Sequence, residues 1–258
     1  MFEKLTKETV RLGAWLRSSV LVATAGILAA CSATPTVDVP TAQQQAPALL
    51  HQALYNFPDA APAYEYRGVP KHGKAILVNI PSFELIAFED GKPVLRSRVI
   101  VGKRSTPTPI MQTETSVVRF RPTWTPTPRM IRSGKYRPGT RPPGKRNPLG
   151  FLAIRLAPGM LIYLHGTNKP QLFDKDGRAL SHGCVRVEKW DEVAAWVLDS
   201  SVEQVHGHAY GRRTFDAQTS GIPVIMSYQL RFPDANGVMR DWDDIYRRGT
   251  ETVLAQTL

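Results

Sequence analysis

The chain contains 258 residues, of which 42% are hydrophobic and 21% are charged. These values are close to the average of globular proteins, so they exclude a wholly disordered, collagen-like or coiled-coil protein. Lysine and arginine exceed aspartate and glutamate by 33 to 22, which gives a formal net charge of +11. Such a surplus favours an anionic partner, either nucleic acid, an acidic membrane surface or an acidic polymer. Two cysteines, Cys31 and Cys184, are too few for a disulfide scaffold.

The first thirty residues are typical of an export signal. A basic segment precedes Val20–Ala30, an apolar run that is shorter than the about 20 residues that a membrane-spanning helix needs. The run ends in Leu28-Ala29-Ala30-Cys31, which resembles the bacterial lipobox. This resemblance implies that residues 1–30 are removed and that Cys31 becomes the lipidated N-terminus. Ser32 then implies sorting to the outer membrane, so that the protein is periplasmic and held to the membrane by its lipid. The alternative is ordinary cleavage near an incidental cysteine.

Residues 31–73 have the composition of a tether. The stretch from Ser32 to Pro70 is rich in alanine, threonine and glutamine and contains six prolines. Such a sequence buries too little apolar surface to fold alone. We predict a linker here, with a possible short helix around Ala48–Phe57.

A strand-rich body is predicted over residues 74–248. Short runs of branched and aromatic residues, separated by proline or glycine, predict strands at 75–80, 83–88, 94–101, 117–120, 151–156 and 161–164. Asp90-Gly91 predicts a hairpin turn between the second and third of these strands. One helix is expected at Lys189–Asp199, with Val193, Trp196 and Val197 on its buried face. Asp191 and Glu192 near its start complement the helix dipole.

A second hairpin is predicted near the end of the chain. Ile222–Phe232 and Val238–Trp242 flank an Asn236-Gly237 turn. Many short strands and one clear helix favour a mainly β fold, either a sandwich or a barrel-like body with a few helices. Its core is expected at about 74–210, followed by the hairpin at 222–242.

The segment Thr115–Phe173 contains eleven lysines or arginines and no acidic residue. One interpretation is a solvated basic loop that serves solubility. Another is a stiff, proline-rich flap beside a site for carboxylated substrates. Nucleic-acid binding through the arginines and Trp124 is a third. Because exported, tethered proteins seldom meet nucleic acid, we do not expect nucleic acid as the partner.

Two short segments contain residues suited to nucleophilic chemistry. Tyr163-Leu164-His165-Gly166 ends an apolar run, and Ser181-His182-Gly183-Cys184 follows it after a spacer. A thiol reacts as the thiolate, and a nearby imidazole can accept its proton. Glycines beside the nucleophile allow close approach and leave backbone N–H groups to stabilise an oxyanion.

Two other interpretations of these residues stay open at this point. Cys184 could be an inert buried cysteine, which is the commoner situation for an isolated thiol. A zinc site formed by His165, His182 and Cys184, with His206 or His208, is the other alternative. The spacing of these residues does not match a recognised zinc-ligand pattern, and His206 and His208 are expected to be ordinary surface or loop residues.

The order of a histidine, a spacer, Ser-His-Gly-Cys, a hydrophobic residue and Arg186 resembles the signature of the L,D-transpeptidase (YkuD-type) catalytic domain. The resemblance extends from about Lys74 to Arg248. It is strongest toward the branch that forms 3→3 peptidoglycan cross-links, on the segments Pro143-Gly144, Asn147–Gly150, Tyr163–His165, Arg178–Leu180 and Asp243–Tyr246.

The resemblance implies a role for each motif residue. Cys184 would be the nucleophile and His165 its base, with the Gly166 carbonyl orienting the imidazole. The backbone of Gly183 and Cys184 would form the oxyanion hole. The remaining residues would support the loop or contact the substrate: Ser181, His182, Arg186, Tyr163 and Trp124. His182 is also a rival candidate for the base. Arg186 stands where many proteins of the family have asparagine. Tyr163 and Trp124 could equally belong to the core.

The implied reaction is acyl transfer on peptidoglycan stem peptides through a cysteine thioester, without a metal or an organic cofactor. The diaminopimelate–D-Ala bond of a tetrapeptide would be cleaved and a 3→3 cross-link formed. Related alternatives are attachment or release of a wall-linked lipoprotein, and a non-catalytic wall-binding lipoprotein that keeps the motif. No oligomeric state is indicated.

Overall fold

The computed structural model describes residues 64–249. The predicted signal, Cys31 and the possible helix at 48–57 lie outside the described residues, as does most of the predicted tether. The end of that tether differs from the prediction. Tyr64 packs edge-on against Phe232, with ring centroids 5.7 Å apart, and Tyr66 packs against Phe88 at 4.8 Å. The packed body therefore begins before Lys74, because these two aromatic rings bury apolar surface against it. The sequence did not predict this, since the surrounding residues have the proline-rich composition of a linker.

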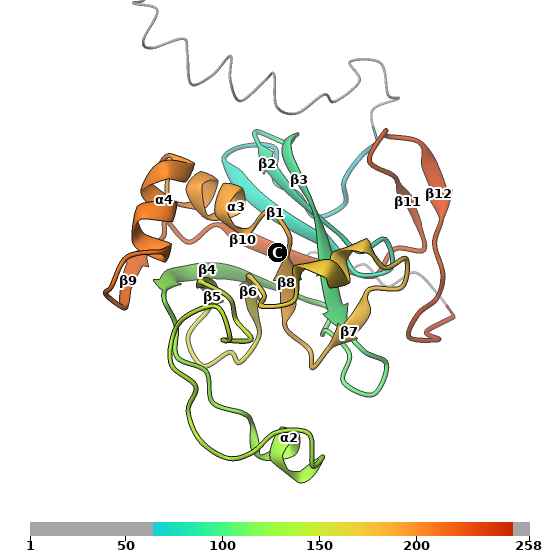
Figure 1. The fold of residues 1–258 in the computed structure, drawn as a ribbon. Coiled ribbons are helices and arrows are strands. Elements are labelled where there is room, and N and C mark those ends of the chain that lie inside the picture. The colour runs from blue at the N-terminus through green and yellow to red at the C-terminus, as the bar shows by residue number, and fades with distance from the viewer. Residues whose placement is uncertain (1–63, 250–258) are drawn as a thin grey trace, which may run out of the picture. The chain divides into compact units, whose positions relative to one another are not determined.

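The described residues form a mainly β fold, as predicted. The first elements are β1 (Lys74–Asn79), β2 (Glu84–Glu89), β3 (Lys92–Gly102), β4 (Met111–Phe120), α2 (Pro128–Arg132), β5 (Leu152–Leu156) and β6 (Tyr163–His165) (Figure 1). They are followed by a 3-10 helix η1 (Pro170–Asp174), β7 (Ala179–Ser181), β8 (Val185–Val187), α3 (Trp190–Val197), α4 (Val202–Ala209), β9 (Phe215–Gln218), β10 (Pro223–Ser227), β11 (Arg231–Pro233) and β12 (Met239–Asp241).

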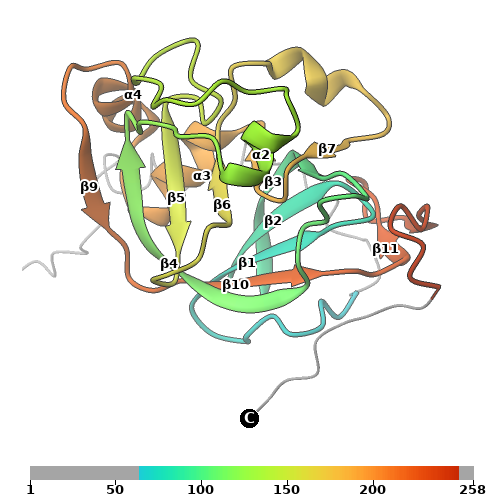
Figure 2. The same ribbon diagram turned by 90° about the horizontal axis from the view of Figure 1, so that it is seen from below.

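Eight strands close into a barrel in the order β10-β1-β2-β3-β8-β6-β5-β4, because β4 also pairs with β10 (Figure 2). The first half of β4 pairs with β10 and its second half with β5 and β9, on either side of an irregularity between Thr115 and Val117. The sequence predicted only the second half, Val117–Phe120. The first half is polar and alternates between partly buried and exposed positions, so it lacks the dense apolar pattern of a buried strand.

Strand β1 is buried on both faces, which explains its unbroken aliphatic sequence. Ile76 and Val78 belong to the main core, whereas Ala75 and Leu77 belong to a second cluster on the other side, together with Phe232. The predicted Asp90-Gly91 turn is confirmed between β2 and β3. Both of its residues have positive φ, 48° and 73°, as a type I′ hairpin turn requires.

The described residues form more helices than the one that the sequence located. Helix α3 is confirmed, and its predicted residues Val193, Trp196 and Val197 are buried. The sequence located only this helix within the body, whereas the described residues also form α2 and α4, in keeping with the expected few helices. Helix α4 begins at a capping box formed by Ser201 and Gln204, and it buries only two of its eight side chains, so its apolar signal is weak.

The C-terminal hairpin is confirmed as β11 and β12, but Ile222–Phe232 is not one continuous strand. Its first part is β10, which closes the barrel, and its last part is β11.

No helix within residues 64–249 combines the length and apolarity needed to cross a membrane.

Candidate active site

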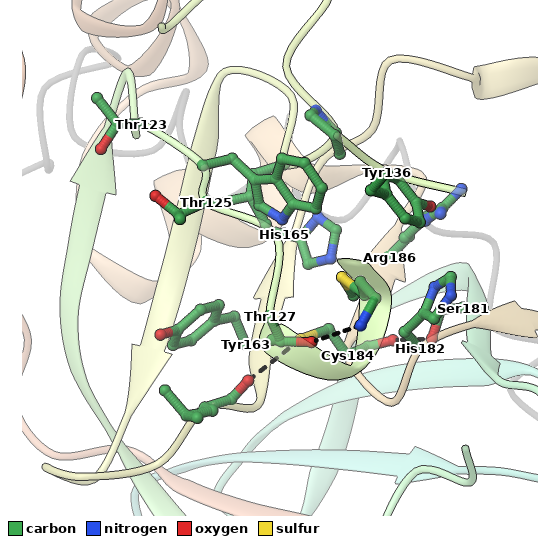
Figure 3. A pocket seen from close by; sticks show the side chains of 15 residues that line it. Thr123, Thr125, Thr127, Tyr136, Tyr163, His165, Ser181, His182, Cys184 and Arg186 are labelled. Atoms are coloured by element: carbon green, nitrogen blue, oxygen red, sulfur yellow. Dashed lines mark hydrogen bonds between the residues drawn. The ribbon is translucent and has the colours of Figure 1, made fainter. Parts of the chain in front are cut away.

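The two candidate segments lie on adjacent parallel strands. In the pairing of β6 with β8, Leu164 is opposite Val185 and His165 is opposite Arg186. Leu164 and Val185 are fully buried in the barrel core. Because side chains alternate along a strand, His165 and Arg186 point to the outer face, and Cys184, one position before Val185, points the same way. The structure thus brings the predicted thiol and imidazole together on one surface (Figure 3).

This surface forms the floor of a cavity of about 300 Å³, a size within the usual range for small-molecule sites. The β4–β5 loop (residues 121–151) contains α2 (Figure 2), and side chains of this loop also line the cavity. Tyr163 and Trp124 both line the cavity, so neither is purely a core residue. The loop also contributes side chains that sequence reasoning missed: Thr123, Thr125, Thr127, Met130 and Tyr136. No recognised motif marks these positions in the sequence.

The His165 imidazole is held in one orientation. Its Nδ1 lies 2.6 Å from the Gly166 carbonyl oxygen. Because a carbonyl can only accept, Nδ1 carries the proton and Nε2 is the basic nitrogen. The residue is 5% exposed. Burial, assisted by the nearby Arg186 cation, lowers the pKa of His165 to about 3 despite the opposing effect of the Gly166 and Leu149 carbonyls. The imidazole is therefore neutral at physiological pH.

Gly150 permits the backbone of Gly166 and Thr167 to approach closely. A Cβ atom at Gly150 would lie 2.7 Å from the Thr167 nitrogen and 2.9 Å from the Gly166 carbonyl carbon. Gly150 also has a φ of +72°, which glycine adopts at little cost. Gly150 belongs to the Asn147–Gly150 segment on which the family resemblance partly depends. Its small size lets the chain pack closely beside the carbonyl that orients the imidazole.

Cys184 is half-buried and its sulfur borders the cavity. The Cys184 thiol donates a weak hydrogen bond to the Leu161 carbonyl oxygen, with Sγ and the oxygen 3.4 Å apart. Burial raises the pKa of the Cys184 thiol above its ordinary value of 9.0, although the Tyr163 backbone N–H and Arg186 favour the thiolate. The resting site is consequently a neutral thiol beside a neutral imidazole. The alternative of an inert cysteine buried in the core is not supported, because Cys184 lines a cavity.

Ser181 shapes the turn that presents the thiol. Its hydroxyl donates to the Cys184 carbonyl at 2.6 Å and accepts from the Gly183 N–H at 3.1 Å. Gly183 has a φ of +120°, outside the range favoured by other residues. The Ser-His-Gly-Cys order therefore combines a local hydrogen-bonding residue with a glycine that permits the turn.

A buried network behind this turn was missed in the sequence. The Thr108 hydroxyl donates to the Gly183 carbonyl at 2.8 Å and accepts from the Gly102 N–H at 2.8 Å. The Tyr246 hydroxyl donates to the Gly102 carbonyl at 2.6 Å and accepts from the Thr108 N–H at 3.1 Å. Tyr246 was quoted only as part of a resemblance, and Thr108 carries no sequence signal.

His182 also borders the cavity, with its ring 5.6 Å from that of Tyr136. Burial, then the charges of Lys103, Arg186, Lys135 and Arg129, lower the pKa of His182. Its ring makes no hydrogen bond to a backbone carbonyl within the described part of the chain, in contrast to His165.

The basic segment lies beside the site, as the flap interpretation expected, but its charges are not in the cavity lining. Its lysines and arginines in the β4–β5 loop do not line the cavity, and the side chains that do line it from this loop are uncharged. Arg129, Arg132 and Lys135 are exposed. The charges of this loop are therefore not part of the cavity lining, although Arg129 and Lys135 are near enough to help lower the pKa of His182.

His206 and His208 lie on α4 and do not border the cavity. His206 pairs with Asp191 at 2.7 Å, and the His208 ring packs 5.2 Å from Phe120. Among residues 64–249 no group of three or more His, Cys, Asp or Glu side chains is arranged to hold a metal. The zinc alternative is not supported by this arrangement.

The lowered pKa of His165 predicts a pH-dependent contribution to stability. Below the ordinary His pKa of 6.5 the unfolded chain binds a proton that the folded chain, with a pKa of about 3, does not bind. Stability is therefore lost as the pH falls from 6.5 toward 3, by about 2 kcal/mol at pH 5. Denaturant unfolding at pH 7 and pH 5 should show this additional loss in the wild type and its absence in His165→Gln. Equal losses in both proteins would contradict the assignment.

Comparisons with known proteins agree with this geometry. The family model for the YkuD L,D-transpeptidase catalytic domain matches residues 73–224. A putative L,D-transpeptidase of Haemophilus influenzae is 31% identical over 237 residues, which are 75% of this chain and 48% of that protein. The probable L,D-transpeptidase YcfS of Escherichia coli is 36% identical over 176 residues, 64% of this chain and 50% of that protein. The chain thus spans about half the length of these relatives.

Solved structures give a weaker likeness. The L,D-transpeptidase from Mycobacterium smegmatis shares 20% identity over 59% of this chain and 58% of that one, with a TM-score of 0.38. The family model covers more than half of the chain, and its range contains the whole β6–β8 site. The chain belongs to the L,D-transpeptidase (YkuD) catalytic-domain family.

Proposed function

We propose that this protein is a peptidoglycan L,D-transpeptidase that acts through a thioester on Cys184 and forms 3→3 cross-links. The donor would be a tetrapeptide stem, cleaved between diaminopimelate and its terminal D-Ala. The observation that carries the proposal is the placement of the Cys184 thiol and an oriented, neutral His165 imidazole on one outer face of paired strands, in one cavity.

In the first step the Cys184 sulfur attacks the carbonyl carbon of the scissile amide. The thiol proton passes to Nε2 of His165, which is the free basic nitrogen because Nδ1 donates to Gly166. The carbon–nitrogen bond then breaks, and His165 returns the proton to the leaving amine. D-Ala departs and the stem remains joined to the enzyme as a thioester.

In the second step an acceptor amine, the side-chain amine of another diaminopimelate, attacks the thioester carbonyl. His165 takes a proton from the attacking amine, the carbon–sulfur bond breaks, and the proton returns to the Cys184 sulfur. One amide is exchanged for another, and two displacements replace one difficult step. The chemistry needs only side chains and backbone groups.

The oxyanion of each tetrahedral intermediate requires hydrogen-bond donors. The Gly183 N–H already donates to the Ser181 hydroxyl. The Cys184 N–H is therefore the oxyanion donor that this turn would supply, in place of the Gly183 and Cys184 N–H groups together that the sequence predicted. Gly183 would then serve the site through its backbone conformation.

We also propose that the reaction takes place in the periplasm, with the protein held to the outer membrane by a lipid on Cys31. This location is supported by the Leu28–Cys31 sequence and by the basic segment and apolar run that precede Cys31.

Digested cell wall from bacteria that overproduce the full chain tests the reaction. Diaminopimelate–diaminopimelate dimers, identified by mass spectrometry, should increase with the wild type and stay at the background level with Cys184→Ala. Altered lipoprotein attachment without such dimers would instead support attachment or release of a wall-linked lipoprotein. An unchanged wall, together with equal wall binding by both proteins, would support a non-catalytic binding role.

A further inference from the structure

Among the residues of 64–249 that line the cavity, Arg186 is the only one with a permanently charged side chain, and none is a carboxylate. It comes from β8, two positions after Cys184, and lies opposite His165 in the strand pairing. The site therefore places one cation next to both groups proposed to react. Figure 3 shows Arg186 beside Tyr136 at the edge of the site.

One nitrogen of the Arg186 guanidinium has no partner in the described part of the protein. This atom, Nη1 of Arg186, is buried. No Asp or Glu of residues 64–249 forms an ion pair with it, whereas Arg98, Arg119 and Arg240 each pair with a carboxylate. Buried polar groups are normally paired, and an arginine fork matches a carboxylate in shape and charge. An unpaired cation in a substrate cavity indicates that its partner arrives with the substrate.

We propose that Arg186 binds the terminal carboxylate of the residue released when Cys184 attacks the donor. This inference rests on the proposed function. The leaving amine must reach His165 to receive its proton, and the terminal carboxylate is attached to the carbon next to that amine. It is therefore constrained to lie within a few ångströms of the imidazole, where Arg186 is located. The other carboxylates of a stem peptide are separated from the scissile bond by flexible chains.

This assignment makes Arg186 a specificity-determining residue. A donor that ends one residue beyond the scissile bond supplies the carboxylate, whereas a longer or amidated donor leaves the guanidinium unpaired. The carboxylate would also neutralise the cation that helps to keep His165 from binding a proton. The basicity of the imidazole would then rise while the donor is bound and fall again when the released amino acid departs.

Binding to the full-length Cys184→Ala protein tests the inference without turnover. Titration calorimetry would compare a tetrapeptide donor that has a free terminal carboxylate with the same peptide as its terminal amide. The acid should bind about 100-fold more tightly than the amide, as expected for a charge-assisted pair. In Cys184→Ala/Arg186→Gln the two peptides should bind alike, and Arg186→Lys should keep part of the preference.

Arg132→Gln in the Cys184→Ala background is the matched control, because it removes the same charge from an exposed position outside the cavity. It should keep the full preference for the acid. Equal binding of acid and amide by Cys184→Ala, or an unchanged preference in the Arg186→Gln variant, would overturn the inference. The comparison within Cys184→Ala holds even if Arg186→Gln fails to fold.

The outcome is separable from that of the proposed function. An Arg186-dependent preference for the acid, in a protein whose wild type forms no cross-link, would reject the reaction and retain the carboxylate site. Cross-linking by the wild type with no preference between the two peptides would retain the reaction and reject the role of Arg186.

Discussion

A carbapenem β-lactam is expected to acylate the wild-type protein once and the Cys184→Ala variant not at all. The Cys184 sulfur borders an open cavity, and His165 can accept its proton as the sulfur attacks the lactam carbonyl. Intact-mass spectrometry of both proteins would show one added acyl mass or none. Cys31 remains in both, so the variant also reports whether the other cysteine of the chain reacts.

The control for this experiment is alkylation of the denatured wild type by iodoacetamide, which shows that the Cys184 thiol is present and reduced. A reduced thiol without a carbapenem adduct in the folded protein would contradict a competent nucleophile.

Because burial raises the pKa of the Cys184 thiol, the folded protein should react with iodoacetamide slowly at pH 7 and faster as the pH rises.

Replacing His165 with glutamine should slow acylation by about 1000-fold, within the usual range for a lost general base. His182→Gln is the matched control, because it makes the same substitution at the rival histidine of the same cavity. It should slow acylation by less than about 10-fold. The reason is that only the His165 ring is fixed by a backbone carbonyl with its basic nitrogen free.

The measurement is the loss of carbapenem absorbance in rapid mixing, with the fold of each variant checked by circular dichroism. A larger loss of rate in His182→Gln than in His165→Gln would reassign the base to His182. Equal, small losses in both variants would contradict base catalysis by either imidazole.

Local chemistry accounts for the parts of the fold that the sequence predicted well. Strands β1, β2 and β3 pair in sequence order through short connections, and the two-residue turn between β2 and β3 depends on the positive φ of Asp90 and Gly91. Helix α3 has a strongly apolar face, with five buried residues in eight. Helix α4 was missed because its contacts are made mainly through two buried side chains, Val205 and Ala209.

Other parts depend on pairings between distant segments. The first half of β4 is a strand because β10, more than a hundred residues later, completes its hydrogen bonds. Tyr64 and Tyr66 pack against the body because Phe88 and Phe232 form a surface for their rings. No local pattern encodes such partners, since the free energy that stabilises them comes from burial in the folded chain.

The sequence by itself determined the chemical groups of the site: a cysteine and a histidine, a serine and a glycine that shape the turn, and a surplus of positive charge. These properties belong to individual residues and their immediate neighbours. Only the tertiary structure decided that the parallel pairing of β6 with β8 places the thiol, the imidazole and Arg186 on one face, and that the charges of the β4–β5 loop stay outside the cavity lining. The physical reason is that a side chain's direction and its desolvation depend on which strands pack together, and strand packing is a property of the whole chain.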